Sequence, residues 1–512
     1  MEGYYSILNK IGATAMIHYE DYEPPTFLNE DAVFAALDDI RQNRRRVLMP
    51  GDPDVDGLSC LMVLKDAFEA MGYSDYDFFP YEEKNHGVNP NCIWRAIQQK
   101  YDYVIITDSG CNSLVELQQL LTYGIKVIIL DHHRAQQDYR VYDEMGISCI
   151  NTQIDNAVLG EVRYALSAAA LCFCVMEKYL RRIGKKVPAS LSVYALISLY
   201  SDCMDMSNRL NKQIYYLANG RPKGEMPDMV QYFMTVHTRL SRRFIEYWYA
   251  PRINALFRAD AVKYINYYFL EKQRNADVIA ACLQNIEVVY TTCRDVISKV
   301  ADLLSDAPPT EWENVAVVDL KAISPFYDVK ANRLYNYTGL IANKLSEKWG
   351  KAVVVCCEMA DGYKGSVRDQ RGRDYLSSFK RICNAGGHAS AFGFQVPKFE
   401  YQNFLQALHH VDKYYTQDSA PNAPIVIEYD NDLPDERLLG QIARYNDFCG
   451  ERVPYIYLLK TMQGSITPVY SSYDYQYRWG DSLSISSKRN LLLGEKLYLK
   501  PYVSNSLKLE VQ

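Results

Sequence analysis

Acidic and imidazole side chains follow several apolar runs in the first half of this 512-residue chain. The segment RRRVLMPGDPDVDG ends in alternating aspartates, and YDYVIITDSG and KVIILDHH also end in an acid or in histidines. LISLYSDCMDM places a further aspartate after an apolar run, so we count four strand ends that supply such side chains. The residues concerned are Asp52, Asp54, Asp56, Asp108, Asp131, His132, His133 and Asp202.

Carboxylates combined with imidazole suit Mn²⁺, whereas carboxylates alone favour Mg²⁺. Five or more such groups at neighbouring strand ends could hold two cations about 3.5–4 Å apart, and such a pair activates water for phosphoester cleavage. A single strand-end aspartate is more often a helix N-cap, and adjacent histidines are usually incidental. The run that starts at Asp52 also resembles a calcium loop, but its twelfth position is Val63 instead of glutamate. Capping alone explains four such ends poorly, so the pattern favours a metal site.

Strand-like and helix-like segments alternate through this region, which predicts a parallel α/β sheet. LSCLMVLKDAFEAMG and LVELQQLLTYG have helical spacing and close on Gly72 and Gly124. Ligands of such sheets bind beyond the carboxyl ends of the strands, which is where the acids lie. Further along, residues 270–304 contain neither Pro nor Gly and predict one long helix. A second α/β unit follows, with strands near VAVVDL and AVVVCCEM, and short apolar runs after residue 424 predict a small β-rich domain.

The composition is that of a soluble globular protein, with 48% hydrophobic and 23% charged residues. The net charge of −6 argues mildly against nucleic-acid binding, although a local basic groove is compatible with it. Thirteen cysteines without a CxxC pair predict reduced thiols. We find neither a signal peptide nor an apolar run of 18 residues, so we expect a cytoplasmic protein without membrane contact.

The segments GDPDVDG, VIITDSG, LDHH and LYSDCMD resemble, in this order, the four motifs of the DHH phosphoesterase superfamily. Within it the chain resembles the RecJ family of single-strand-specific exonucleases. APRINALFRAD is similar to that family's PRLNAAGR segment, and GSVRDQRGRDYLSSF and NAGGHASAFG are similar to the S-x-R and GGHxxAxG of the DHH-associated domain. LLGQIARYNDFCGERVPYIYL is similar to the start of an OB-type domain, whereas the last fifty residues match poorly.

The resemblance implies a role for each matching residue. The metal ligands would be Asp54, Asp56, Asp108, His132 and Asp202, with Asp108 bridging two divalent cations, Mn²⁺ first and Mg²⁺ as the alternative. Asp52 would lie beside them, and His133 would face the phosphate or orient a ligand, so these two are the catalytic candidates. The substrate-binding candidates are Ser366, Arg368, Gly386, Gly387, His388, Arg252, Asn254 and Arg258.

The resemblance also implies four parts: a DHH catalytic domain (1–265), a connecting helix (266–308), a DHH-associated substrate-binding domain (309–415) and an OB-type C-terminal domain (420–512). The implied activity is metal-dependent 5′-to-3′ hydrolysis of single-stranded DNA to 5′-mononucleotides in DNA repair or recombination, with replication or repair proteins as partners. The alternatives are an oligoribonucleotide or dinucleotide phosphodiesterase, and a catalytically silent DNA-binding scaffold. FPYEEKNHGVNP departs from the family, because it lacks an arginine for which Lys84 or His86 would have to substitute.

Overall fold

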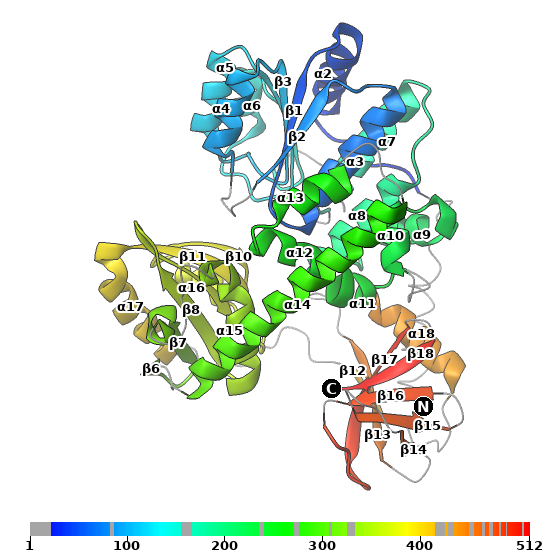
Figure 1. The fold of residues 1–512 in the computed structure, drawn as a ribbon, viewed down its shortest axis with the longest axis vertical. Helices are drawn as coiled ribbons and strands as arrows, with labels where there is room; N and C mark the ends of the chain where they lie inside the picture. Colours follow the sequence, from blue (N-terminus) through cyan, green and yellow to red (C-terminus); the bar gives the residue numbers. More distant parts are fainter. Residues whose placement is uncertain are drawn as a thin grey trace. The chain divides into compact units, whose positions relative to one another are not determined.

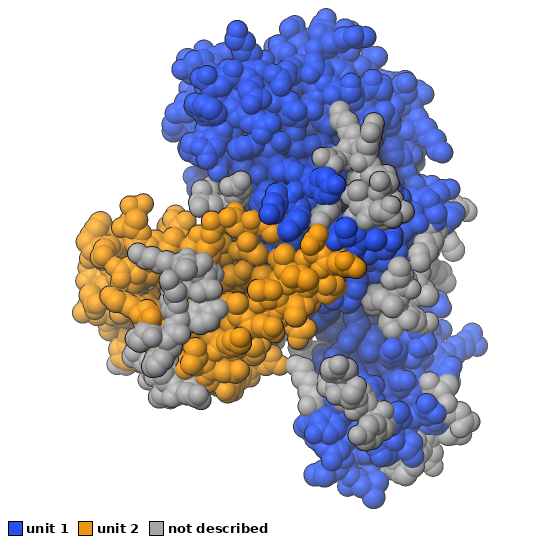
Figure 2. All heavy atoms as spheres, viewed as in Figure 1, with its two compact units in different colours: residues 1–257, 262–283, 424–512 blue, residues 258–261, 284–423 orange. Residues whose placement is uncertain are grey.

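The chain divides into two compact units (Figure 2). Unit 1 comprises residues 1–257, 262–283 and 424–512, and unit 2 comprises residues 258–261 and 284–423. The computed structural model describes residues 22–81, 87–154, 166–234, 240–270, 276–306, 310–324, 333–414, 425–428, 435–449, 455–462, 466–469, 475–480, 483–487, 489–503 and 506–512.

A parallel five-stranded sheet forms the N-terminal part of unit 1, as the alternating pattern predicts. Its order is β2-β1-β3-β4-β5, and its central strands are buried along their whole length. Two of its strands, β2 and β5, are not among the strands predicted from sequence. The strands are β1 Val47–Gly51, β2 Tyr76–Pro80, β3 Tyr103–Thr107, β4 Lys126–Asp131 and β5 Ser148–Asn151.

Helices cover both faces of this sheet, with α4, α5 and α6 on one face and α3 and α7 on the other (Figure 1). The predicted helix ends at Gly72 and Gly124 are confirmed, because both glycines adopt the positive φ that closes a helix. The bounds are α2 Glu30–Asn43, α3 Val55–Met71, α4 Pro90–Gln98, α5 Leu114–Thr122, α6 Tyr139–Met145, α7 Ala168–Arg182, α8 Ser190–Ser201, α9 Arg209–Asn219, α10 Asp228–Phe233, α11 Arg242–Phe244, α12 Ala250–Arg258 and α13 Val262–Ile265.

Our count of four strand ends is wrong at Asp202. The apolar run before this residue is helix α8, and Asp202 is its C-cap. Every residue of α8 before Ser201 is buried, because the helix packs against α3, α7 and α9. A helix that is covered on all sides shows no period of 3.6 residues in its apolar positions, so a short stretch of it resembles a buried strand.

The predicted long helix is confirmed as α14, Ala276–Asp306, and the division between the two units falls within it. Unit 2 continues with a six-stranded mixed sheet in the order β10-β11-β9-β8-β7-β6. Phe379, Phe392 and Phe394 lie in its core. The elements are β6 Thr310–Glu311, β7 Val315–Asp319, β8 Ala352–Glu358, β9 Gly362–Arg368, β10 Asn384–His388, β11 Ala391–Pro397, α15 Thr338–Trp349, α16 Leu376–Phe379 and α17 Tyr401–Tyr414.

The C-terminal part of unit 1 is rich in β-structure, as predicted. Its strands form one sheet in the order β12-β13-β17-β18-β16-β15-β14, packed around Trp479 and the apolar face of α18. The elements are β12 Ile425–Glu428, α18 Glu436–Asn446, β13 Ile456–Thr461, β14 Ile466–Val469, β15 Tyr475–Trp479, β16 Leu483–Ser487, β17 Lys496–Val503 and β18 Leu507–Val511. Among the described residues, none of the helices combines the length and the apolarity that crossing a membrane requires.

Candidate metal centre and substrate-binding residues

The first three aspartates lie between β1 and the first turn of α3. Asp54 is the N-cap of α3, and its Oδ1 accepts hydrogen bonds from the backbone N–H groups of Asp56 and Gly57 at 3.1 and 3.2 Å. A Cβ atom on Gly57 would lie 2.4 Å from the carbonyl oxygen of Asp52, so only glycine fits there. The tight turn therefore brings Asp52, Asp54 and Asp56 together at one strand end.

Asp56 is buried and accepts hydrogen bonds from two helices. The first N–H groups of α7 donate to it, Ala168 to Oδ2 at 3.0 Å and Ala169 to Oδ1 at 2.9 Å. The hydroxyl of Ser198 on α8 donates to Oδ1 at 2.5 Å. Burial raises the pKa of Asp56 to about 6, although the neighbouring His132 opposes the rise.

Asp108 follows β3 and has a positive φ of 58°. This left-handed conformation is uncommon outside glycine, although aspartate tolerates it better than most residues, and it often marks a functional position. Asp108 is only 3% exposed, and burial together with the nearby Asp56 raises its pKa well above the ordinary value. Cys203, which directly follows Asp202, has a φ of 55°. Two left-handed residues thus lie at or next to the acidic cluster.

His132 lies among three carboxylates. Its Nε2 is 3.2 Å from Oδ1 of Asp108, 3.7 Å from Oδ2 of Asp202 and 3.8 Å from Oδ2 of Asp56. Burial alone would lower the pKa of His132, but Asp202 and Asp56 outweigh this effect and raise it.

The potential ligand atoms form three overlapping groups, and within each group they lie within 4.8 Å of one another. Asp108 belongs to two of these groups, and so does His132. The groups are Asp108, His132 and His133; Asp56, His132 and Asp202; and Asp52, Asp54 and Asp108.

Asp131 holds the two histidines in place. Its Oδ1 accepts hydrogen bonds from the backbone N–H groups of His132 and His133 at 2.8 and 3.0 Å, and it lies 2.9 Å from Nδ1 of His133. Burial would raise the pKa of Asp131, but its contacts with His133 lower it to about 2. Burial would lower the pKa of His133, but Asp131 raises it to about 9. This raised pKa favours the imidazolium form of His133 at neutral pH.

Two substrate-binding candidates lie side by side in unit 2. Ser366 and Arg368 are on β9, and the hydroxyl of Thr338, the first residue of α15, is 2.9 Å from that of Ser366. A Cβ atom on Gly339 would lie 2.8 Å from Nη2 of Arg368, so glycine lets the start of α15 approach the guanidinium. The positive end of a helix dipole and a guanidinium together favour an anion.

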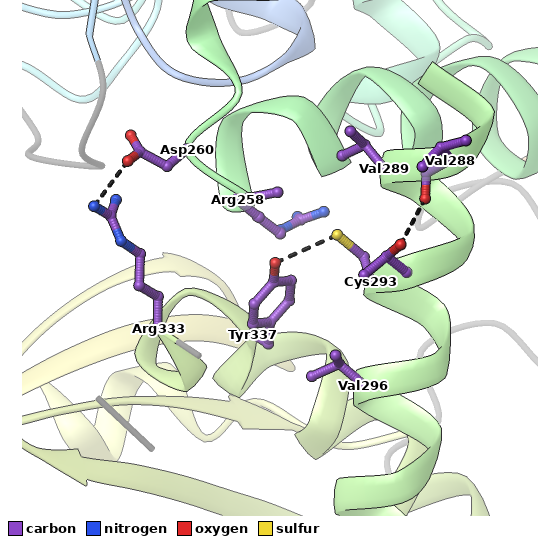
Figure 3. Close-up of a pocket in the computed structure, with 10 residues that line it drawn as sticks. Arg258, Asp260, Val288, Val289, Cys293, Val296, Arg333 and Tyr337 are labelled. Carbon is purple, nitrogen blue, oxygen red and sulfur yellow. Dashed lines mark hydrogen bonds and ion pairs between the residues drawn. The ribbon is translucent and has the colours of Figure 1, made fainter. Parts of the chain in front are cut away.

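Arg258 belongs to the same region of unit 2. Burial, together with the charge of Arg258, lowers the pKa of Arg368 to about 10. Arg258 lines a cavity of about 380 Å³ next to α14 (Figure 3). Arg333 forms an ion pair with Asp260 there at 2.7 Å. The hydroxyl of Tyr337 contacts the thiol of Cys293 on α14. Two guanidinium groups close to each other create a positive local potential in a protein of negative net charge.

Part of the chain matches a known family. Residues 46–199 match the model of the DHH family, N-terminal domain. This part of the chain is therefore similar to DHH domains. It includes the candidate ligands before Asp202, whereas Asp202 itself lies three residues beyond the match.

The chain is also similar to named exonucleases over most of its length. Single-stranded-DNA-specific exonuclease RecJ of Thermus thermophilus is 22% identical over 438 residues, which cover 83% of this chain and 60% of that protein. This chain therefore spans less than two thirds of that relative. Crystal structures of RecJ from the same organism in complex with Mn²⁺ and with Mg²⁺ match with TM-scores of 0.70 and 0.64. Identity is 16% and 17%, and the matches cover 96% of this chain and 72% and 70% of those chains, so they show a shared fold.

Residues 46–199 and the nearby Asp202 together present a donor set that fits divalent cations. Hard carboxylate oxygens and an imidazole nitrogen gather where burial has raised the pKa values of Asp56 and Asp108. A bound cation would offset the cost of burying these charges, and it would lower both pKa values.

The two glycines of β10, Gly386 and Gly387, differ in the space around their Cα atoms. Gly387 has a φ of 136°, and a Cβ atom there would lie 2.8 Å from Cα of Phe392. A Cβ atom on Gly386 would meet nothing within 4 Å. Packing against Phe392 therefore requires glycine at position 387, whereas no neighbouring atom would exclude a Cβ atom at position 386. The side chain of His388 lies outside the described part of the chain.

Arg252 and Asn254 lie on α12. Arg252 donates to the carbonyl oxygen of Trp248 at 2.9 Å, and its guanidinium lies 4.0 Å from the centre of that indole ring. Oδ1 of Asn254 is buried and has no hydrogen-bond partner among the described residues. Lys84 and His86 lie outside the described residues.

Sequence reasoning missed the residues that hold the candidate ligands. Ser198 and the start of α7 bind Asp56, Asn151 donates through Nδ2 to the carbonyl oxygen of His133 at 2.9 Å, and Thr338 contacts Ser366. Ser167 before an apolar run is an N-cap signal that could have located the start of α7. Nothing in the local sequence indicates that this helix start faces Asp56.

Proposed function

We propose that this protein is a metal-dependent exonuclease that hydrolyses single-stranded DNA in the 5′-to-3′ direction and releases 5′-mononucleotides. The observation that carries the proposal is the overlap of three potential ligand groups around Asp108 and His132. The similarity to proteins named single-stranded-DNA-specific exonucleases supports the choice of substrate.

Two divalent cations fit the overlapping groups, with Mn²⁺ preferred because imidazole takes part and Mg²⁺ as the alternative. Asp108 would contribute to both ions, because it belongs to two of the groups. Such cations polarise a phosphoryl oxygen and lower the pKa of a coordinated water. The ligands in this proposal are Asp54, Asp56, Asp108, His132 and Asp202.

The side chains around the ligands have separate roles. His133 is half-exposed, and the Asp131 carboxylate favours its protonated form, so it can neutralise charge that develops on a phosphate. Asp131 orients its ring, because Nδ1 faces the Asp131 carboxylate. Asp52 is buried beside Asp54 and Asp108, where its carboxylate can orient water or a ligand.

We further propose that Ser366 and Arg368 anchor the 5′ phosphate of the strand. A guanidinium binds a phosphate dianion in fork geometry, and a hydroxyl adds another hydrogen bond. Arg258 adds positive charge, and the start of α15 adds the favourable end of its dipole. Such an anchor would set the distance from the strand end to the cleaved bond, and therefore the polarity of degradation.

The division into DHH, connecting-helix, DHH-associated and OB-type parts is also our proposal, with the boundaries predicted from sequence. Gly386, Gly387, His388, Arg252 and Asn254 complete the proposed substrate contacts. A role in DNA repair or recombination, with replication or repair proteins as partners, would follow from the activity, as would a cytoplasmic location.

Product analysis tests the activity. The protein is incubated with Mn²⁺ and, in parallel, 5′-labelled single strands, blunt duplexes and dinucleotides. We expect mononucleotides from single strands and slow release from duplexes. Degradation from the 3′ end, or a preference for dinucleotides, would contradict the proposal. Protein that binds Mn²⁺ but cleaves none of these substrates would favour a catalytically silent DNA-binding scaffold.

The anchor is tested with Arg368→Ala on strands with a 5′ phosphate or a 5′ hydroxyl. The matched control is Arg381→Ala, which removes another arginine of the same unit. We expect the 5′-phosphate preference to fall at least about 10-fold in Arg368→Ala, with Mn²⁺ binding unchanged, since a charge-assisted hydrogen bond contributes about 1.5–3 kcal/mol. Equal preferences in Arg368→Ala, Arg381→Ala and wild type would remove Arg368 from the anchor.

A further inference from the structure

Two serines lie behind Asp56, one on each of two helices. Ser167 is the N-cap of α7, Ser198 lies in the last turn of α8, and both are fully buried. Their hydroxyls are in direct contact with each other, and Ser198 also contacts Oδ1 of Asp56. The backbone N–H of Ala170 reaches the hydroxyl of Ser167 at 3.4 Å.

The number of available protons determines which group donates in each of these hydrogen bonds. A hydroxyl has one proton to donate, and an ionised carboxylate can only accept. If Ser198 donates to Asp56, the contact between the two serines requires Ser167 to donate to Ser198. Ser167 in turn accepts from Ala170, as an N-cap side chain does.

The two oxygens of Asp56 therefore have different surroundings. Oδ1 accepts from Ala169 and Ser198, and the thiol of Cys60 lies 3.9 Å from it. Oδ2 accepts from Ala168, and it is the oxygen that faces Nε2 of His132.

We propose that Ser167 and Ser198 are positioning residues that leave Asp56 able to bind a cation only through Oδ2. The inference rests on the proposed function, because it concerns the same metal site. Donors that fill Oδ1 prevent the carboxylate from rotating into a bidentate mode, in which both oxygens would approach one ion. They also hold Oδ2 next to His132.

Loss of the Ser198 hydroxyl should weaken the site without removing a ligand. Hydrogen-bond partners of metal ligands typically change metal affinity or activity about 10–100-fold when they are mutated. We expect the Mn²⁺ dissociation constant of Ser198→Ala to rise by that factor. The matched control is Ser192→Ala, because Ser192 is a buried serine of the same helix whose hydroxyl donates to the carbonyl oxygen of Ala189.

The measurement is a titration with Mn²⁺, followed by the electron paramagnetic resonance signal of the free ion. Circular dichroism first establishes that each variant is folded, so a loss of stability cannot imitate weaker binding. Ser192→Ala should bind as wild type does, and Ser167→Thr, which keeps a hydroxyl and an N-cap, should lose little affinity. If Ser198→Ala does not fold, Ser198→Cys takes its place, because a thiol is only a weak donor.

Wild-type affinity in the folded Ser198 variant overturns this inference and leaves the proposed function standing. Affinity that falls equally in Ser192→Ala also overturns it, because the effect would then be one of general packing. Wild-type protein that binds no Mn²⁺ overturns both the inference and the proposed function.

Discussion

Replacement of Asp131 by asparagine should remove the charge of His133 and leave most of the local backbone intact. An asparagine oxygen can still accept from the N–H groups of His132 and His133, as Oδ1 of Asp131 does now. It cannot stabilise an imidazolium as a carboxylate does. The variant therefore isolates the interaction between the Asp131 carboxylate and the His133 ring.

The size of the effect follows from the pKa values of the pair. The pKa of Asp131 falls from 3.8 to about 2, which corresponds to about 2.4 kcal/mol at about 1.36 kcal/mol per pH unit. The pKa of His133 rises further, from 6.5 to about 9, but its side chain is 49% exposed and solvent screens part of its share. We therefore calculate the effect from the pKa of Asp131 alone. We expect Asp131→Asn to lose roughly 1.5–2.5 kcal/mol of unfolding free energy.

The loss should depend on pH. The folded pKa of His133 is raised, so its contribution is full below about pH 6.5 and is lost as the pH rises through about 9. The folded pKa of Asp131 is lowered, so its contribution is present above about pH 4 and is lost as the pH falls through about 2. The difference between wild type and variant should therefore be largest between about pH 4 and pH 6.5.

Urea unfolding of the metal-free proteins across this pH range measures the difference, and nuclear magnetic resonance of the ring protons follows the pKa of His133. Asp138→Asn is the control, because Asp138 is the N-cap of α6 and asparagine caps equally well. A pKa of His133 that stays near 9 in Asp131→Asn would refute the reasoning, as would a stability difference that is constant with pH.

Two further outcomes follow from the site and from unit 2. Asp108→Ala should keep its circular dichroism spectrum but lose the proposed nuclease activity at least about 100-fold. It would remove a proposed metal ligand, and loss of a residue that only supports a ligand already costs about 10–100-fold. A rate assay with Mn²⁺ checks this. Gly387→Ala should destabilise unit 2 by roughly 1–3 kcal/mol through its left-handed backbone and its contact with Phe392, whereas Gly386→Ala should change little. Thermal unfolding separates the two glycine variants, and equal melting temperatures would contradict this prediction.

The parallel sheet and the meeting of its acidic strand ends could be predicted from sequence, because both depend on local patterns. A strand that is buried on both faces is a short apolar run, and the residue after it lies at a known edge of the sheet. Asp108 and His132 were located in this way, and the structure places Oδ1 of Asp108 3.2 Å from Nε2 of His132.

The remaining parts of the site depend on contacts between distant segments. Ser198 lies on a helix that is buried on all sides, so its sequence indicates no direction for any of its side chains. Thr338 reaches Ser366 across 28 residues, and Arg258 acts on Arg368 across a longer separation. Local patterns carry no information about such pairs. The run before Asp202 resembles a strand for a different reason, which is that α8 is buried on all sides and shows no helical period.

The bonds between Asp56 and the start of α7 join residues that are 112 and 113 positions apart. The carboxylate lies at the end of the first strand, whereas its backbone donors belong to a helix that follows the last strand of the same sheet. A chain that had formed only the sheet would lack these donors and Asp202. Mn²⁺ binding would therefore require the α7–α8 pair to be docked on the sheet, and its affinity would report this docking. Because a cation that binds only the native state stabilises it in proportion to the logarithm of its concentration, the metal would also stabilise the docked helices.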